Sequence, residues 1–385
     1  MSINYGKQNI DQRDIDSVSD VLKGKYITQG PKIEEFELTL KTEFGSKHCC
    51  ALSSGTGALH LSAIALGWSK DDIIISTPIT FIASINCIVY VKATPDFVDI
   101  NSSNFTIDPN KLEDKINKYR LKGKKIKAVI GVDYAGHPAD WKALRYLANK
   151  FNFQLINDNC HAMGASYFND TKYAIKYADV VIQSYHPVKH ITTGEGGAIF
   201  TNDKLINKKV RSLRSHGMVK KADNKNYGSW YYEMHEIGFN YRITDMQCAL
   251  GISQMKRLND FISMRRKIAK QYDNLLGDNK NCIIPKVENH VKHAYHLYPL
   301  QGRFEKIKNS KITFFNKMKD KGIQLQVHYI PVHLQPYYKK KHNFRVGDFP
   351  LAENYYKREF SIPIYPNLKK TKINKIINEI KKNLI

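Results

Sequence analysis

Short apolar segments alternate with helical patterns through the first two thirds of this 385-residue chain. Glycine, proline or polar residues bound the apolar segments, which lie at 50–52, 73–75, 128–132, 154–156 and 180–182. Strands that alternate with helices form a largely parallel sheet, because each strand reaches the next through a helical crossover. The sequence therefore predicts an α/β sheet whose ligand-binding loops follow the carboxyl ends of the strands.

Helical patterns are expected at both ends of the chain and near its middle. Residues 10–23 place apolar side chains on one face, and Gly24 is a suitable residue for ending the helix. Thr244 is expected to N-cap a long helix that leads out of the sheet region. The segment 323–329 is expected to form a strand, and the isoleucines within 373–380 indicate an amphipathic C-terminal helix.

Length and composition limit the class of protein. Apolar residues form 42% of the chain and charged residues 25%, so a sizeable core can be buried. The length predicts a large domain over 1–255 and a smaller C-terminal α/β domain over 256–385. No apolar run reaches the roughly 18 residues that cross a bilayer, and the first residues lack the apolar part of a secretion signal. The six cysteines show no motif spacing, so we expect reduced thiols in a cytoplasmic protein without membrane association.

The charge balance is unusual. Sixty Lys and Arg against 36 Asp and Glu give a net charge of +24, which is compatible with nucleic-acid binding. No helix-turn-helix, RRM or zinc-finger pattern accompanies it, so a phosphate-bearing small ligand is favoured and a nucleic-acid-binding regulator is the alternative. A metal site is not expected, because Pro187 breaks the helix that would align His186 with His190.

The segment 184–197 carries the residue best suited to catalysis. It follows the apolar strand 180–182, so it begins where a parallel sheet presents its ligands. Lys189 lies within it, among hydroxyl-bearing residues and glycines. A lysine amine can form an imine with an aldehyde cofactor, and its pKa falls readily on burial. A surface lysine is the alternative, and position alone does not decide between the two.

Two further segments favour the catalytic interpretation. In the turn 53–59, small residues allow backbone N–H groups and the Thr56 hydroxyl to approach a phosphate at a helix N-terminus. Asp158 follows the run 154–157 and would direct a carboxylate into the cleft, where a pyridoxal ring needs one beside its nitrogen. Taken alone, the turn is common between a strand and a helix, and Asp158 could equally be a helix N-cap.

The order of phosphate turn, aspartate and lysine closely resembles that of the DegT/DnrJ/EryC1/StrS nucleotide-sugar aminotransferases. The resemblance extends from Tyr5 to Pro366. The segments that carry it are 28–31, 54–56, 77–81, 158–165, 184–197, 238–242 and 361–366. It implies a pyridoxal 5'-phosphate enzyme with the aspartate-aminotransferase fold (fold type I), which has a large, mostly parallel-sheet domain and a smaller C-terminal domain.

The resemblance also implies roles for single residues. Lys189 would form the Schiff base with the cofactor, and Asp158 would bind the pyridine nitrogen. His161 would hydrogen-bond the ring hydroxyl, and Phe81 would stack on the ring. The residues expected around the cofactor phosphate are Gly55, Thr56, Gly57, Ser184 and, from the neighbouring subunit, Asn240. The resemblance therefore implies a homodimer with shared active sites.

Within the family, the motifs at 5–8, 186–193 and 327–333 are most similar to those of 4-aminotransferases of pseudaminic acid biosynthesis. This similarity implies amino transfer from L-glutamate to C4 of a UDP-linked 2-acetamido-2,6-dideoxy-4-ketohexose. The residues expected to contact the nucleotide sugar are Tyr5, Lys25, Tyr26, Ile27, Thr28, His328 and Tyr329. The sequence departs from the family pattern at three positions, where Asn157, Cys160 and Tyr185 replace the more frequent glutamate, alanine and phenylalanine.

Two alternatives remain within the same family. The first is an aminotransferase for a different nucleotide-4-ketosugar. The second is a pyridoxal-phosphate-dependent sugar dehydratase, in which a histidine takes the place of the Schiff-base lysine. His190 is adjacent to Lys189, but the spacing from Ser184 to the glycines at 194–197 places Lys189 in that position.

Overall fold

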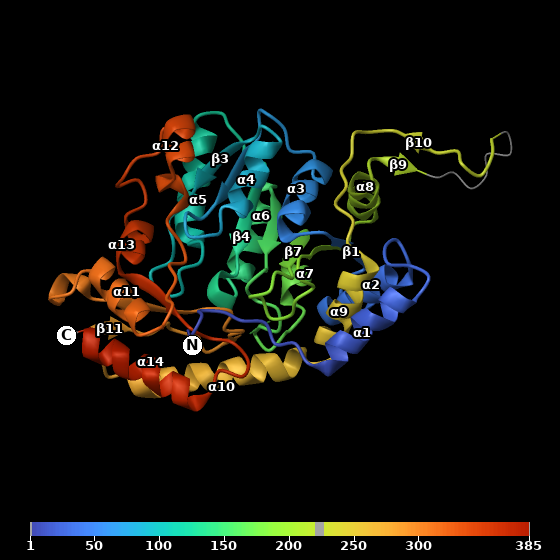
Figure 1. Ribbon diagram of the computed structural model, residues 1–385. Helices are drawn as coiled ribbons and strands as arrows, with labels where there is room; N and C mark the ends of the chain where they lie inside the picture. The colour runs from blue at the N-terminus through green and yellow to red at the C-terminus, as the bar shows by residue number, and fades with distance from the viewer. Residues whose placement is uncertain (1, 220–226, 385) are drawn as a thin grey trace.

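The computed structural model describes residues 2–219 and 227–384, and its centre is a seven-stranded sheet (Figure 1). The strands follow the order β1-β8-β7-β5-β4-β2-β3. Neighbours from β7 to β3 run parallel, whereas β8 is antiparallel to both β1 and β7. The bounds are β1 His48–Leu52, β2 Ile73–Ser76, β3 Thr94–Phe97, β4 Ala128–Val132, β5 Gln154–Asp158, β7 Val180–Ser184 and β8 Gly197–Thr201. The predicted mostly parallel α/β sheet is confirmed.

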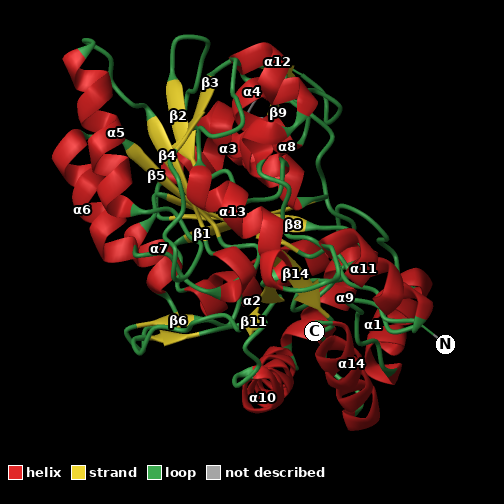
Figure 2. Ribbon diagram, turned by 90° about the vertical axis from the view of Figure 1, so that its left-hand side faces the viewer, coloured by secondary structure: helices red, strands yellow, loops and turns green. Residues whose placement is uncertain are grey.

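Helices cover both faces of this sheet (Figure 2). One face packs against α2, α5, α6, α7 and α9, and the other against α3, α4 and α8. In β4, Val129 belongs to the first core and its neighbour Ile130 to the second, as the alternation of side chains along a strand requires. Burial on both faces explains why such strands are continuous apolar runs in the sequence. The bounds are α2 Pro31–Phe44, α3 Gly55–Ala65, α4 Ala83–Tyr90, α5 Pro109–Leu121, α6 Trp141–Phe151, α7 Tyr173–Tyr177, α8 Lys204–Arg214 and α9 Asp245–Met255.

A smaller sheet and three helices enclose a third core. Strand β13 lies between β11 and β14 and is antiparallel to both. The bounds are β11 Cys282–Ile283, β13 Tyr298–Gly302, β14 Glu359–Ile362, α10 Leu258–Leu276, α11 Lys311–Asp320 and α14 Lys370–Asn383. The division at residue 255 stays a prediction. Side chains on both sides of it mix, since Ile3 packs into the third core and Tyr355 into the core on the α3 face of the large sheet.

Shorter elements lie around these cores. Strand β6 (Ser166–Tyr167) pairs with β12 (Val291–Lys292). Strand β9 (Met218–Val219) pairs with β10 (Glu233–Met234) in a ribbon that projects from the body in Figure 1. Helices α12 (Pro336–His342) and α13 (Pro350–Arg358) pack beside the α3 face of the large sheet. Within the described ranges, no helix combines the length and the apolar character needed to cross a membrane.

Three of the four predictions about single segments are confirmed. Helix α1 (Gln12–Lys23) ends at its cap Gly24, Thr244 caps α9, and the predicted C-terminal helix is α14. The prediction of a strand at 323–329 is wrong. The segment changes partner along its length, with one bridge from Ile323 to Ile3 and another from Gln326 to Ser361, so no continuous ladder forms.

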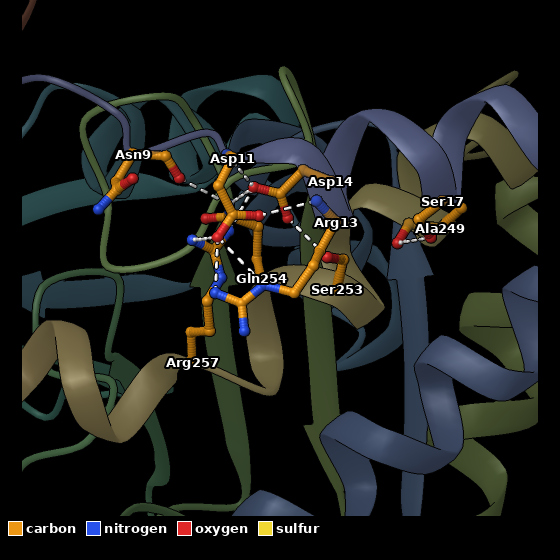
Figure 3. Close-up of polar contacts among 9 residues, drawn as sticks. All are labelled: Asn9, Asp11, Arg13, Asp14, Ser17, Ala249, Ser253, Gln254 and Arg257. Carbon is orange, nitrogen blue, oxygen red and sulfur yellow. Dashed lines mark hydrogen bonds and ion pairs between the residues drawn. The ribbon is translucent and has the colours of Figure 1, made fainter.

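A buried ionic cluster fixes the start of α1 to the junction of α9 and α10 (Figure 3). Asp14 is 1% exposed and forms an ion pair with Arg257. Its carboxylate also accepts hydrogen bonds from the Ser253 hydroxyl at 2.6 Å and the Gln254 amide at 2.8 Å. The N-terminal arm, the segment that precedes α1, is therefore anchored where it joins the helix. The arm carries Tyr5, whose carbonyl accepts a hydrogen bond from the backbone N–H of Ile364 at 3.1 Å.

Candidate active site

A cavity of about 510 Å³ opens at the carboxyl ends of β4, β5 and β7, whose last residues all line it. The large sheet supplies one side of the cavity. The N-terminal arm and the segment before β14 supply the other. The predicted site residues that line it are Tyr5, Gly55, Thr56, Phe81, Asp158, His161, Ser184, Lys189, His328 and Tyr329. Tyr5 and Tyr329, which are far apart in the sequence, thus line the same cavity.

The other predicted site residues do not line this cavity. Gly57 lies behind it, where its N–H donates to the Ser54 hydroxyl at 3.0 Å. The turn of Lys25, Tyr26, Ile27 and Thr28 and the residue Asn240 belong to a different part of the surface. Thr28 pairs with Thr244 there, and the N–H of Asp245 donates to the carbonyl of Ile27. The turn and Asn240 therefore lie near one another, close to the start of α9.

Lys189 lies in the loop between β7 and β8. Its backbone N–H donates to the carbonyl of His186 at 2.9 Å, and the loop is held in shape by the hydroxyl of Thr192, which donates to the carbonyl of Tyr185 at 2.9 Å. Burial lowers the pKa of the Lys189 amine, and Arg265 lowers it further, against the opposing influence of Cys160 and Asp158. A lowered pKa increases the fraction of neutral amine, which is the nucleophilic form.

Asp158 ends β5, and two donors hold its carboxylate. The Ser84 hydroxyl donates to Oδ2 at 2.6 Å, and the backbone N–H of Cys160 donates to Oδ1 at 3.2 Å. Since Ser84 donates to Asp158, its oxygen is left to accept the hydroxyl proton of Thr80 at 2.9 Å. Sequence reasoning missed Ser84. The available signal was its position at the start of α4, shortly after the family segment 77–81.

The phosphate end of the site is formed by backbone in close contact. Ser54 N-caps α3, and a Cβ added at Gly55 would lie 2.9 Å from the Cβ of Ser184. A Cβ added at Gly197 would lie only 2.4 Å from the carbonyl of Ser54. These glycines leave an unobstructed helix N-terminus, which attracts anions through its free N–H groups and its dipole. The hydroxyls of Thr56 and Ser184 line the cavity there.

His161 has a defined hydrogen-bonding state. Its Nδ1 lies 3.3 Å from the backbone N–H of Ala135 and must accept that proton. Burial lowers the pKa of His161 well below the usual range, so the ring is neutral and its single proton is on Nε2. Nε2–H then donates to the Tyr329 hydroxyl at 3.1 Å. Tyr329 is left with its own hydroxyl proton to donate.

Several cavity residues had no signal in the sequence analysis. His296 packs against His161 with ring centroids 4.3 Å apart, and Glu195 and Gln326 line the same cavity.

The predicted residue Phe81 is 53% exposed, with its ring centroid 6.1 Å from that of Tyr329. An aromatic side chain this exposed beside a cavity has a face available for stacking on a planar ligand.

The donors in the cavity fit pyridoxal phosphate. A helix N-terminus with adjacent hydroxyls suits a phosphate, and the glycine-lined approach leaves room for one. Asp158, which lines the same cavity, suits a protonated ring nitrogen, and Lys189, which also lines it, suits an aldehyde. The residues present in the cavity therefore fit this cofactor.

Comparison with known proteins gives consistent results. The profile of the DegT/DnrJ/EryC1/StrS aminotransferase family matches residues 8–381. The chain is 39% identical over 389 aligned positions to the UDP-4-amino-4,6-dideoxy-N-acetyl-beta-L-altrosamine transaminase of Campylobacter jejuni (strain 81-176), which covers 99% of both chains. It is 34% identical to the spore coat polysaccharide biosynthesis protein SpsC of Bacillus subtilis over 98% of this chain and 96% of SpsC.

Solved structures agree with these relatives. Helicobacter pylori PseC, described as an aminotransferase involved in the biosynthesis of pseudoaminic acid, superposes with a TM-score of 0.90 at 31% identity over 100% of this chain and 99% of PseC. The PLP form of the putative sugar aminotransferase Spr1654 from Streptococcus pneumoniae superposes with a TM-score of 0.88 at 25% identity, covering 100% and 99% of the two chains.

Proposed function

Because this chain belongs to the DegT/DnrJ/EryC1/StrS aminotransferase family and is a pyridoxal-phosphate-dependent sugar aminotransferase, we propose that it aminates a UDP-linked 2-acetamido-2,6-dideoxy-4-ketohexose at C4. L-glutamate is the proposed amino donor and pseudaminic acid biosynthesis the proposed pathway. The observation that carries the proposal is the cavity itself, where Lys189 and Asp158 share one hollow with Tyr5, His328 and Tyr329. The names of the Campylobacter and Helicobacter relatives support the choice of sugar.

Bound pyridoxal phosphate supplies a carrier for the amino group and an electron sink. The N-terminus of α3, with Thr56 and Ser184, would hold its phosphate. Asp158, kept as an acceptor by the Ser84 hydroxyl, would hold a proton on the ring nitrogen. Lys189 Nζ would bind the cofactor at rest. During turnover it would accept a proton from Cα of glutamate and, in the second half-reaction, deliver one to C4 of the sugar.

One cavity has to receive glutamate and the nucleotide sugar in turn, so we expect double-displacement (ping-pong) kinetics. Tyr5, His328 and Tyr329 lie on the side opposite the sheet and would orient the sugar. Both reactants are anions, and the net charge of +24 of the chain favours their approach. We further propose that the reaction takes place in the cytoplasm, since none of the six cysteines forms a disulfide and five of them are buried thiols.

We propose that the active enzyme is a homodimer in which each subunit completes its partner's site. The Lys25–Thr28 turn and Asn240 are the residues assigned to the partner's cavity. Exposed apolar side chains near them support an interface between copies of the chain. Ile27 is 49% exposed, and Ile237, three residues before Asn240, is 82% exposed. Contiguous exposed apolar patches are uncommon on monomeric proteins and often mark an interaction surface.

The dehydratase alternative is disfavoured by the position of His190. This histidine does not line the cavity, and its Nε2 lies 3.2 Å from the carbonyl of Ala294. Lys189, by contrast, does line it. The residue that reaches the reaction space is therefore an amine, as amino transfer requires.

A substrate panel tests the proposal. The holoenzyme is incubated with L-glutamate and UDP-, GDP- or dTDP-linked 4-ketosugars, and 2-oxoglutarate and the aminated sugar are measured, with Lys189→Ala as the inactive control. We expect the UDP-linked 2-acetamido-2,6-dideoxy-4-ketohexose to give the highest kcat/KM and an amino group at C4. Higher kcat/KM for another 4-ketosugar would overturn the assignment of the sugar. An active Lys189→Ala control would overturn the assignment of the lysine.

A further inference from the structure

Behind the cavity, a closed hydrogen-bonded ring joins His328 to β14. His328 lines the cavity and is 5% exposed. Its Nδ1 lies 2.9 Å from the Ser361 hydroxyl, and that hydroxyl lies 2.6 Å from Oε1 of Glu359. Oε2 of Glu359 accepts the backbone N–H of His328 at 2.9 Å. Both the ring and the backbone of His328 are therefore tied to the same carboxyl group.

The direction of these hydrogen bonds follows from the charge of Glu359. An ionised carboxylate can only accept, so Ser361 donates to it and Ser361 Oγ accepts a proton from Nδ1–H of His328. A neutral carboxyl group with its proton on Oε1 donates to Ser361, and Ser361 then donates to Nδ1. The imidazole of His328 is neutral, because burial, together with the charge of Lys189, lowers its pKa to about 3. Its one proton is consequently on Nδ1 in the first case and on Nε2 in the second.

Nε2 is the ring nitrogen left for the cavity, since Ser361 holds Nδ1. No hydrogen bond joins Nε2 to any other residue in the part of the chain that the structure describes. We propose that Glu359, acting through Ser361, sets the role of His328 toward the substrate: Nε2 accepts a hydrogen bond when the carboxylate is ionised and donates one when it is neutral. Glu359 and Ser361 are thus positioning residues for a reaction whose substrate rests on the proposed function.

Both states of Glu359 lie within reach of ordinary pH. Burial raises the pKa of its carboxyl group, while the hydrogen bonds from Ser361 and His328 and the charge of Lys311 lower it. Lys311 titrates in the same range, because burial lowers the pKa of its amine to about 8 while the charge of Glu359 raises it. The phenols of Tyr134, Tyr329 and Tyr355 also respond to this carboxyl group, but their pKa values are raised well above the usual range, so they stay neutral. Below the pKa of Glu359, His328 would donate to an oxygen such as a ketone. Above it, His328 would accept from a hydroxyl or amino group.

Replacement of Glu359 by glutamine fixes the direction of the hydrogen bonds that lead from residue 359 through Ser361 to His328, which we call the relay. The amide oxygen keeps the bond from the His328 N–H, and the amide NH₂ takes the place of Oε1 and must donate to Ser361. Ser361 then donates to Nδ1, which forces the proton of His328 onto Nε2. The side chain keeps its size, so the change reverses hydrogen-bond direction with little change in packing.

Imidazole ¹⁵N shifts of the ¹⁵N-histidine-labelled, full-length holoenzyme report the tautomer directly. The His328 signals are assigned by their loss in His328→Gln. From pH 6 to 9.5 we expect the native protein to populate the Nδ1–H form increasingly, and Glu359→Gln to stay in the Nε2–H form throughout. Ser361→Ala should uncouple the tautomer from pH, and Ser361→Thr, which keeps the hydroxyl, should restore the native behaviour. Identical His328 tautomers in the native protein and Glu359→Gln over the whole range would overturn the proposal.

A matched control uses the other buried histidine–glutamate pair, in which His333 Nε2 lies 3.0 Å from Glu353 Oε1 away from the cavity. Glu353→Gln should leave the His328 signals unchanged.

At pH 9, Glu359→Gln should raise KM for the accepted nucleotide sugar about tenfold, because Nε2 of His328 changes from an acceptor to a donor and then faces a donor group of the sugar. The KM for glutamate should be unchanged. The ¹⁵N measurement needs no sugar, so failure of the relay and failure of the proposed substrate are distinguishable.

Discussion

Gly197 begins β8 at the point where this strand crosses the phosphate turn. It pairs with Leu52 on one side and Ser184 on the other, so its position is fixed by two ladders. In Gly197→Ala, the new Cβ would lie 2.4 Å from the carbonyl carbon and oxygen of Ser54 and 2.5 Å from the backbone nitrogen of Gly55. All three atoms belong to the backbone, so no side-chain rotation can relieve the overlap. The turn and the start of α3 have to move.

The size of the effect follows from these distances. Non-bonded heavy atoms are in favourable contact at roughly 3.5 Å, so the turn must shift by about 1 Å. Such a shift misaligns the N–H groups that would bind the phosphate, and a hydrogen bond to a charged group contributes about 1.5–3 kcal/mol, so the loss approaches 10²-fold in affinity. We therefore expect the affinity for pyridoxal phosphate to fall about 10²-fold. Overpacking should also lower the free energy of unfolding by about 1–3 kcal/mol.

Spectroscopic titration of the apoprotein with pyridoxal phosphate gives the dissociation constant, and urea unfolding of the same apoprotein gives the stability. The control is Gly24→Ala at the end of α1, where the nearest atom to the added Cβ is the Val21 carbonyl oxygen at 3.3 Å and φ is −84°. This variant should bind the cofactor as the parent does. A folded Gly197→Ala protein with parental cofactor affinity would refute the link between β8 and the phosphate turn.

Three further changes test other parts of the site and fold. Lys189→Ala should fold with at least parental apoprotein stability, because burial disfavours the charged amine that the change removes. The variant should release its cofactor on dialysis and lose transamination. Near-normal turnover would contradict the assignment of Lys189 as the catalytic residue. Arg257→Met leaves the buried carboxylate of Asp14 without its ion-pair partner and should lower the free energy of unfolding, measured in urea, by about 3–5 kcal/mol. The control, Arg13→Met at an exposed ion pair, should have little effect. Equal effects would show that the buried cluster does not stabilise the N-terminal arm. Co-expressed Lys189→Ala and Asn240→Asp chains should regenerate activity in a heterodimer, because one of its two sites receives both native residues. If the Asn240→Asp homodimer is impaired but a verified heterodimer shows no recovery, the whole site lies within one chain.

The strands that the sequence predicts are buried on both faces of the sheet, although β8, which is buried in the same way, lies outside the predicted segments. An apolar run such as that of β4 has no other common explanation between two helical patterns. Strand β3 escapes the same reasoning because it contains Pro95 and Asp96, and the sheet admits proline there because β3 is its edge strand. The segment 323–329 has a strand-like pattern, yet its backbone partners lie in two different parts of the chain. Local pattern therefore predicts most of the strands that are buried on both faces, and it fails where the choice of backbone partner decides the structure.

The same distinction applies to the site. Lys189 and Asp158 are recognisable because each follows a strand and carries a chemical group with few alternative uses there. Ser84 and Glu359 are not, because their importance comes from partners that are 74 and 31 residues away, Asp158 and the backbone of His328. A serine or a glutamate in a helix or strand has no local feature that marks such a contact. Sequence reasoning therefore finds the groups that react and misses those that orient them.

Asn157 shows how a departure from the family pattern can leave the chemistry of its neighbour intact. Its side-chain amide donates to the carboxylate of Asp133 at 3.1 Å, and this carboxylate is completely buried. Asp133 also accepts hydrogen bonds from Trp141 at 2.7 Å and from Tyr173 at 2.7 Å, and burial raises its pKa to about 6. A glutamate at 157, the residue that the family resemblance leads us to expect there, would place a second carboxylate beside it and raise that pKa further. The amide instead donates a proton to the buried charge, so the end of β5 keeps its position and Asp158 still reaches the cavity.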